Sequence, residues 1–226
     1  MFRYVLLDLD DTILDFKKAE AVAVSETLHA FGIEPTDAVV LRYSEINESQ
    51  WKLLELGELT REEVKLRRFQ ILFEELGVAC NAEGVRSAYE TRLAEGHFFL
   101  PGAKQLLDDL FGRYALYIVS NGTTSVQNGR IASAGIAHYF KNIFLSEAIG
   151  YVKPQKEFFE ACFARIPNFD PSEAIILGDS LTSDILGGIN AGIRTCWFNP
   201  HKKSAHPDII PDFEIHSLNE FLQILL

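Results

Sequence analysis

The sequence predicts an α/β protein: a Rossmann-like parallel-sheet core with an all-helical cap inserted after the first strand. Outside residues 16–96, short apolar runs ending in polar clusters alternate with helical patterns, as in βαβ units. Within residues 16–96, helix start and stop signals recur without any strand signal. We therefore predict a core domain of residues 1–15 and 97–226 and a helical cap domain of residues 16–96.

The first predicted strand covers Tyr4–Leu7, a run of aromatic, β-branched and leucine residues. Such an uninterrupted apolar run is typical of a strand that is buried on both faces of a parallel sheet. The run ends in the polar cluster Asp8-Leu9-Asp10-Asp11-Thr12. We therefore expect the strand to pass into a loop at Asp8.

Four helices are predicted in the insert from the residues at their ends. The first ends at Gly32, the second starts after Thr36 and ends near Gly57, the third opens with the capping box Thr60-Arg61-Glu62-Glu63 and closes at Gly77, and the fourth runs from Asn81 to about Gly96. The pair Pro101-Gly102 then marks the return of the chain to the α/β core.

Five further strands are predicted in the core after the insert. They cover residues 115–119, 143–145, 174–177, 195–198 and 213–215. In an open parallel sheet, ligands bind outside the carboxyl ends of the strands. Polar residues that follow several of these strands should therefore converge in space, although they are distant in sequence.

Asp8 and Asp10 are the first candidate site residues. Two carboxylates on one loop cannot both stay ionised away from water unless a cation or a proton separates them. This requirement is typical of a metal site, or of a nucleophile with an acid/base partner. The alternative is a solvated Asx turn after a strand.

Three later clusters add hydroxyl, lysine and carboxylate groups. Ser120 begins a run of hydroxyls and backbone amides at a helix start, which suits phosphate oxygens but also suits helix capping. Lys153 follows another strand, and the alternative is an exposed surface charge. Asp179 lies at the end of a strand, and Asp184 lies near the first turn of the next helix. The alternative for Asp184 is that it does no more than complement the helix dipole. The conjunction of these clusters at strand ends favours a common site.

The chemistry of these groups points to phosphoryl transfer with Mg²⁺. Carboxylate oxygens without histidine or thiolate neighbours favour Mg²⁺, which binds one or two carboxylates together with substrate phosphate. An aspartate could then attack a phosphoryl group that a lysine neutralises, forming an aspartyl-phosphate that water cleaves. The formal net charge of the chain is -11, so an anionic substrate needs such a local cation.

Composition and charge exclude several other classes. Of 226 residues, 47% are hydrophobic and 23% are charged, which predicts a globular protein with a substantial core. The negative net charge disfavours nucleic acid and membrane surfaces as partners. Cys80, Cys162 and Cys196 are far apart and are expected to be reduced thiols. We predict a cytoplasmic protein, and the sequence leaves its oligomeric state open.

The four clusters resemble the motifs of haloacid dehalogenase (HAD) superfamily phosphatases, and the helical insert resembles their cap. The resemblance implies that Asp8 is the nucleophile and a metal ligand, and that Asp10 is the general acid/base and binds metal through its backbone carbonyl. It implies that Ser120, with Asn121 and Thr12, binds the substrate phosphate. Lys153 would neutralise the phosphoryl group and Asp8. Asp179 would bind Mg²⁺, and Asp184 would support the metal ligands from behind. Because true dehalogenases lack the second aspartate, dehalogenation is disfavoured.

The cap carries a finer resemblance. Asn47 with Trp51, then Gly57, then Arg68-Phe69 are similar in order and spacing to the house-cleaning pyrimidine 5′-nucleotidases of this superfamily. The resemblance implies a nucleoside monophosphate as substrate. In the alternative interpretation, Trp51 and Phe69 only form the core of the cap.

Other activities stay open beside the nucleotidase hypothesis. They are a phosphoglycolate or sugar phosphatase and a phosphomutase that passes the phosphoryl group to a sugar. A phosphate-binding module without activity is disfavoured, because the acid, hydroxyl and lysine roles are all filled. Phe16 disfavours the glycolate and sugar phosphatases, because these often carry a small hydroxyl residue at this position.

Overall fold

The computed structural model describes residues 1–225, and its core is a parallel sheet. Its strands are β1 (Tyr4–Leu7), β2 (Ala115–Ser120), β3 (Asn142–Leu145), β4 (Ala174–Gly178), β5 (Arg194–Phe198) and β6 (Phe213–Ile215). They form one six-stranded sheet in the order β3-β2-β1-β4-β5-β6, and every neighbouring pair is parallel. All six predicted strands are confirmed, and their ends differ from the prediction by at most one residue.

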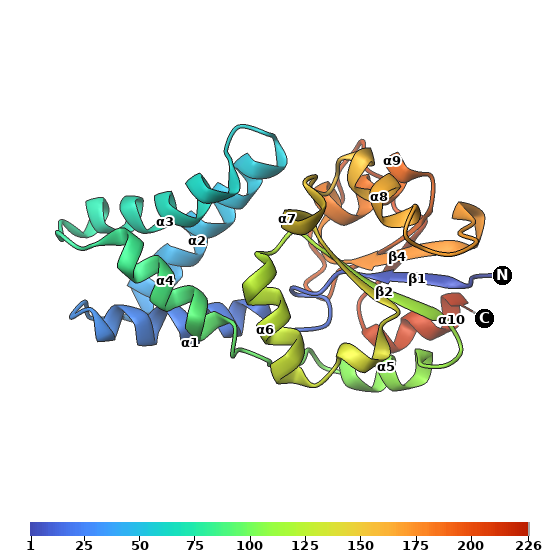
Figure 1. Cartoon of the computed structure of the whole chain (residues 1–226), viewed down its shortest axis with the longest axis horizontal. Helices are drawn as coiled ribbons and strands as arrows, with labels where there is room; N and C mark the ends of the chain where they lie inside the picture. The colour runs from blue at the N-terminus through green and yellow to red at the C-terminus, as the bar shows by residue number, and fades with distance from the viewer. Residues whose placement is uncertain (226) are drawn as a thin grey trace.

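The central position of β1 explains its composition. Its four residues are buried, because β2 and β4 pair with its two edges while helices cover both faces of the sheet. The polar residues that follow β1, β2 and β4 lie at the same edge of the sheet, since the strands run in one direction (Figure 1). The convergence predicted from the strand ends is therefore met.

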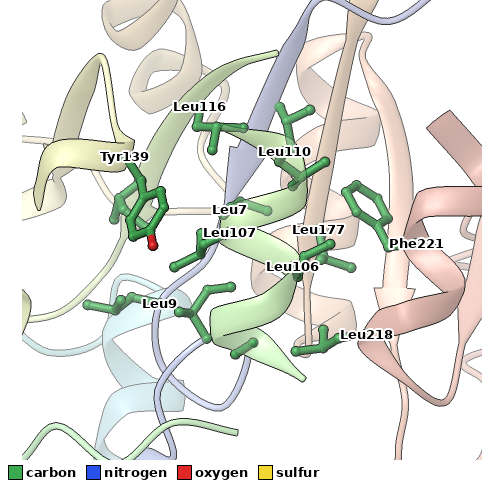
Figure 2. Packing of buried hydrophobic residues seen from close by; sticks show 14 of the residues in the cluster. Leu7, Leu9, Leu106, Leu107, Leu110, Leu116, Tyr139, Leu177, Leu218 and Phe221 are labelled. Atoms are coloured by element: carbon green, nitrogen blue, oxygen red, sulfur yellow. The ribbon is translucent and has the colours of Figure 1, made fainter. Parts of the chain in front are cut away.

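Helices pack on both faces of the sheet. On one face, Leu7 and Leu177 of the sheet contact leucines of α5 (Ala103–Leu110) and Phe221 of α10 (Phe221–Leu225), as Figure 2 shows. On the other face, Phe158 and Phe159 of α8 (Lys156–Phe163) pack against the sheet. The remaining core helices are α6 (Thr124–Ala134), α7 (Ser146–Ile149) and α9 (Leu186–Ala191).

The insert after β1 is helical, as predicted, and we call it the cap. It contains α1 (Phe16–Ala30), α2 (Asp37–Glu55), α3 (Arg61–Leu76) and α4 (Ala82–Leu93). The capping box predicted at Thr60 is formed with Glu63, and Gly77 ends α3 in the left-handed conformation. These helices have an apolar core of their own, in which Tyr43, Phe69 and Tyr89 pack together.

The cap lies beyond the carboxyl end of β1, and its helix α4 packs against α6 of the core (Figure 1). The fold class is therefore the predicted one, an α/β core with a helical cap inserted after the first strand. Among the helices of residues 1–225, none combines the length and the apolarity needed to cross a membrane.

Candidate active site

A cavity of about 480 Å³ lies between the cap and the carboxyl ends of the strands. Both parts of the chain line it, and every predicted site residue except Thr12 is among the lining residues. Nine carboxylate residues and five lysine or arginine residues contribute to its walls. An anionic ligand in this cavity therefore needs a concentrated positive charge at its binding point.

Three carboxylates meet at the core end of the cavity. Asp8 follows β1, Asp179 follows β4, and Asp184 lies in a π-helical turn of residues 181–185. One oxygen from each can be chosen such that all three lie within 4.8 Å of one another. Burial raises the pKa of Asp8 to about 8 and raises the pKa of Asp179 well above its usual value. Neighbouring carboxylates add to both shifts.

This cluster fits a divalent cation. Its members are oxygen donors only, which is the ligand type that Mg²⁺ prefers. Burial and mutual repulsion make the ionised cluster costly, and a bound cation would remove that cost. Asp8 and Asp179 are therefore suited to hold Mg²⁺ directly.

Lys153 contacts two members of this cluster, Asp8 and Asp184, and is 2% exposed. Its Nζ donates to Asp8 Oδ1 at 2.7 Å, to Asp184 Oδ1 at 2.6 Å and to the backbone oxygen of Val119 at 2.8 Å. Burial lowers the pKa of Lys153, but the charges of Asp184 and Asp8 outweigh burial and raise it above the usual value. The alternative of an exposed surface lysine is therefore wrong.

The backbone after β4 is shaped to hold Asp184. A Cβ atom at Gly178 would lie 2.3 Å from the Asp184 carboxylate, so only glycine allows this close approach. The backbone N–H of Ser180 donates to Asp184 Oδ2 at 3.1 Å. Both carboxylate oxygens of Asp184 thus already accept a hydrogen bond, one from Lys153 and one from Ser180, which suits a supporting position within the cluster.

Ser120 and Asn121 follow β2 and have different surroundings. Ser120 Oγ accepts from the backbone N–H of Gly122 at 3.0 Å, which leaves its own hydroxyl proton free to donate into the cavity. The Asn121 side chain exchanges two hydrogen bonds with the backbone of Lys153, at 2.8 and 3.0 Å. Asn121 therefore fixes the lysine loop, and its predicted contact with phosphate stays a prediction.

Thr12 lies apart from these groups. Thr12 is fully buried, and its hydroxyl has no hydrogen-bond partner within residues 1–225. The predicted contact between Thr12 and phosphate stays a prediction that this geometry does not support.

Asp10 has partners that the sequence analysis missed. Gln127 Nε2 donates to Asp10 Oδ2 at 2.6 Å, and Arg130 Nη1 forms an ion pair with Asp10 Oδ1. The same Gln127 nitrogen donates to Ser120 Oγ at 2.8 Å. Gln127 and Arg130 lie three residues apart on α6, so they share one face of it. That spacing was the only signal in the sequence, and it is shared by countless surface pairs.

The cap wall of the cavity is a polar network. Asn47 Nδ2 donates to the buried Glu20 at 2.6 Å, and Asn47 Oδ1 accepts from Trp51 at 3.1 Å and from Arg68 at 2.9 Å. Glu20 also accepts from Ser44 at 2.6 Å. The cap-core interpretation holds for Phe69, which is 0% exposed. It does not hold for Trp51, which lines the cavity.

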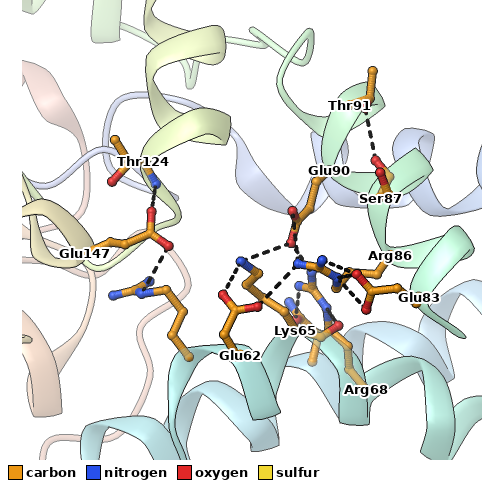
Figure 3. Close-up of polar contacts among 12 residues, drawn as sticks. Glu62, Lys65, Arg68, Glu83, Arg86, Ser87, Glu90, Thr91, Thr124 and Glu147 are labelled. Atoms are coloured by element: carbon orange, nitrogen blue, oxygen red, sulfur yellow. Dashed lines mark hydrogen bonds and ion pairs between the residues drawn. The ribbon is translucent and has the colours of Figure 1, made fainter.

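Next to this network, a charge cluster joins α3 to α4, and its Glu90 also lines the cavity. Lys65 Nζ lies 2.6 Å from Glu62 and 3.9 Å from Glu90, and Arg86 lies 3.7 Å from Glu90 (Figure 3). Arg68 Nη2 lies 3.8 Å from the same Glu90. Arg68 therefore contacts Glu90 of this cluster through Nη2, while its Nη1 donates to Asn47 in the cap wall.

Two contacts join the cap to the core across the cavity. Arg61 donates to the backbone oxygen of Asn121 at 2.5 Å and to Ser146 Oγ at 2.6 Å. On the other side, Thr182 Oγ1 donates to Glu55 at 3.2 Å. The contacts with Asn121 and Thr182 lie in the segments that carry Ser120 and Asp184, and the contact with Ser146 lies at the start of α7.

The comparisons with known proteins agree with this geometry. Residues 5–198 match the family described as haloacid dehalogenase-like hydrolase. The HAD-hydrolase YfnB of Bacillus subtilis (strain 168) is 42% identical over 224 residues, which cover 99% of this chain and 95% of that protein. A crystal structure of YfnB bound to magnesium has a TM-score of 0.95 and covers 99% of this chain and 98% of its own.

Two further relatives carry the name pyrimidine 5′-nucleotidase. PynA of Streptococcus pneumoniae (strain ATCC BAA-255 / R6) is 38% identical over 225 residues, covering 99% of this chain and 95% of that protein. YjjG of Escherichia coli (strain K12) is 30% identical over 222 residues, covering 98% of this chain and 97% of that protein. Both matches therefore include the cap as well as the core.

Proposed function

The chain belongs to the haloacid dehalogenase-like hydrolase family, and from this premise we propose that it is a Mg²⁺-dependent phosphatase that hydrolyses phosphate monoesters. The observation that carries the proposal is the buried ammonium of Lys153 between Asp8 and Asp184, with Asp179 beside them. Such an arrangement suits the neutralisation of a phosphoryl group, which is where the largest part of the rate acceleration must come from.

In the first half of the reaction, a carboxylate oxygen of Asp8 attacks the phosphorus atom in line with the ester oxygen. A bond forms between Asp8 and phosphorus, the ester bond breaks, and protonated Asp10 gives its proton to the leaving alcohol. Lys153 and the hydroxyl of Ser120 offset the charge on the phosphoryl oxygens. When bound, Mg²⁺ neutralises phosphoryl charge as a Lewis acid.

In the second half, a water molecule attacks the phosphorus of the aspartyl-phosphate. Its proton passes to Asp10, the bond between phosphorus and Asp8 breaks, and inorganic phosphate is released. Asp10 thereby regains the proton that it gave away. Its side chain is 28% exposed, so water in the cavity can reach it.

The substrate class proposed is a nucleoside 5′-monophosphate, with a pyrimidine base preferred. The cap, proposed as residues 16–96, would cover the part of the substrate beyond the phosphate. Its wall offers the ring of Trp51 for stacking and the amide and guanidinium of Asn47 and Arg68 for the polar edge of a base. The names of PynA and YjjG support this choice.

A panel of phosphate esters tests both levels of the proposal. We expect Mg²⁺-dependent phosphate release, with higher kcat/KM for UMP, dUMP and dTMP than for phosphoglycolate or hexose phosphates. If phosphoglycolate or a sugar phosphate wins by tenfold or more, about 1.4 kcal/mol in transition-state binding, the nucleotidase assignment is wrong and the phosphatase stands. Isomerised sugar phosphate without free phosphate would indicate a mutase instead.

A further inference from the structure

Asp10 forms an ion pair with the buried Arg130, and the surroundings of Arg130 suit a role in the site better than a role in stabilising the fold. We propose that Arg130 is a positioning residue that orients Asp10 to take the proton of the hydrolytic water, so that it acts on the second half of the reaction. This inference rests on the proposed function, because it assigns a helper to its general base. Arg130 lies on α6, outside the strand ends that supply the other groups.

The burial of Arg130 is costly for the protein. The residue is 0% exposed, and its Nη2 has no hydrogen-bond partner within residues 1–225. A buried ion pair often contributes no more stability than apolar residues of similar volume, because both charges lose their hydration. An arginine with one unpaired nitrogen is therefore a poor device for stabilising the fold.

The guanidinium of Arg130 is fixed by contacts with the two segments in which the chain enters and leaves the cap. Its Nε donates to the backbone oxygen of Gly96 at 3.0 Å, and its Cζ lies 5.5 Å from the ring centroid of Phe16. Phe16 begins α1, and Gly96 follows α4. Arg130 thus has a fixed place from which it sets the direction of the Asp10 carboxylate.

The hydrogen bonds on Asp10 favour the accepting role. Both carboxylate oxygens already face donors, one on Arg130 and one on Gln127. A carboxyl group that donates a proton must present one oxygen as O–H, whereas a carboxylate keeps further lone pairs that can accept. This accepting state is the one that the second half requires, after Asp10 has given its proton to the leaving alcohol.

A defect in this half of the reaction has a distinctive kinetic signature. In a double displacement, kcat/KM reports on steps up to formation of the aspartyl-phosphate, whereas kcat also includes its hydrolysis. With p-nitrophenyl phosphate, the leaving group needs no proton, so Asp10 is not required as an acid. Loss of Arg130, which positions the base Asp10, then lowers kcat and KM together and leaves kcat/KM unchanged.

The experiment compares Arg130→Met and Arg130→Lys with wild type, using p-nitrophenyl phosphate and Mg²⁺. We expect kcat of Arg130→Met to fall by about tenfold to a hundredfold, since misplacement by about 1 Å can cost this much. We expect kcat/KM to stay within about twofold and trapped phosphoenzyme to increase. Arg130→Lys keeps the charge near Asp10, so its kcat should fall less; it also serves if Arg130→Met does not fold.

Ser133→Ala is the matched control. Ser133 lies on the same helix and donates to the backbone oxygen of Glu95 at 3.1 Å, so it also contacts the end of the cap but does not touch Asp10. Its kcat should equal that of wild type. A fall in kcat/KM of the Arg130 variants as large as the fall in kcat would overturn the inference alone. A wild type that releases no phosphate from any ester would overturn the proposed function and this inference with it.

Discussion

The core and the cap meet the same cavity with different kinds of surface. On the core side, Asp8 and Asp179 are placed by the backbone, because each follows a strand at a fixed register of the sheet. On the cap side, Asn47 and Arg68 come from the middle of helices and are placed mainly by each other. Positions fixed by the sheet suit reaction chemistry, whereas a wall of mutually held side chains can change without moving the catalytic groups.

This comparison orders the effects of substitution. A change on the core side should remove activity toward every substrate. A change on the cap side should alter the choice among substrates and leave the chemical step in place.

The largest effect is expected for Asp8→Asn. The substitution keeps the shape of the side chain but removes the charge of the proposed nucleophile and one oxygen of the proposed cation site, so phosphate release should fall to background for all esters. Phosphate release by wild type in excess EDTA should fall as far. Asp15→Asn is the control, because Asp15 lies outside the cavity and caps α1 through its side chain, which asparagine can also do. Substantial turnover by Asp8→Asn would contradict a covalent mechanism.

Lys153→Met should come next, with a loss of both activity and stability. It leaves Asp8 and Asp184 buried without their shared cation, and breaking a buried ion pair on one side typically costs about 3–5 kcal/mol in the free energy of unfolding. Mg²⁺ should restore part of this stability and little of the activity. Denaturant unfolding and phosphate release measure the two effects. Lys156→Met is the control, since Lys156 pairs with Glu160 on the surface, where such pairs contribute little. Equal stability of the two variants would contradict the assignment.

The strand ends and the helix signals were predictable because both follow from local rules. A buried apolar run that ends in acids places Asp8 without knowledge of any other element, and the capping box places the start of α3 in the same way. The structure confirms both. The approach of Asp8, Asp179 and Asp184, whose oxygens lie within 4.8 Å of one another, depends on the whole fold.

The partners of Asp10 and the face of the cap were not predictable from local rules. Arg130 and Gln127 reach Asp10 only because α6 packs beside the junction of cap and core. The sequence of the helix alone does not predict this packing. Trp51 and Phe69 are both aromatic residues of cap helices, yet one lines the cavity and the other is fully buried. Their difference depends on helix rotation, which a single sequence leaves open.

Asn47→Ala should have a smaller effect, confined to substrate choice. It removes the group that joins Glu20, Trp51 and Arg68, so the cap wall loses its order while Asp8 and Lys153 keep theirs. We expect kcat/KM for UMP to fall by about tenfold and that for p-nitrophenyl phosphate by less than about threefold, a difference of roughly 1 kcal/mol. Ser87→Ala, an exposed change on α4, is the control. An equal loss for both substrates would contradict the assignment of substrate choice to the cap and of the chemical step to the core.

The smallest effect is expected in the melting temperature of the metal-free protein as pH changes. Burial raises the pKa of Asp8 to about 8 from its usual 3.8, so between these values the folded chain binds more protons than the unfolded chain. Stability then falls as pH rises through this window, and the loss is complete above the folded pKa. Burial also raises the pKa of Asp179 in the core cluster and of Glu20 in the cap, which adds to the loss in the same direction.

Mg²⁺ separates the two contributions, because within residues 1–225 the three carboxylates of the core cluster are the group arranged to hold a cation, and Glu20 is not part of it. We expect the metal-free protein to melt at least about 2 °C lower at pH 8.5 than at pH 6, which corresponds to a loss of stability of at least roughly 0.5 to 1 kcal/mol. Saturating Mg²⁺ should shrink this difference, since it favours the ionised cluster and displaces its protons. The part that remains reports on groups away from the cluster, such as Glu20, and should be the same in Asp8→Asn. A pH dependence of melting that Mg²⁺ leaves unchanged would show that the carboxylates of the core site do not act as a cation site.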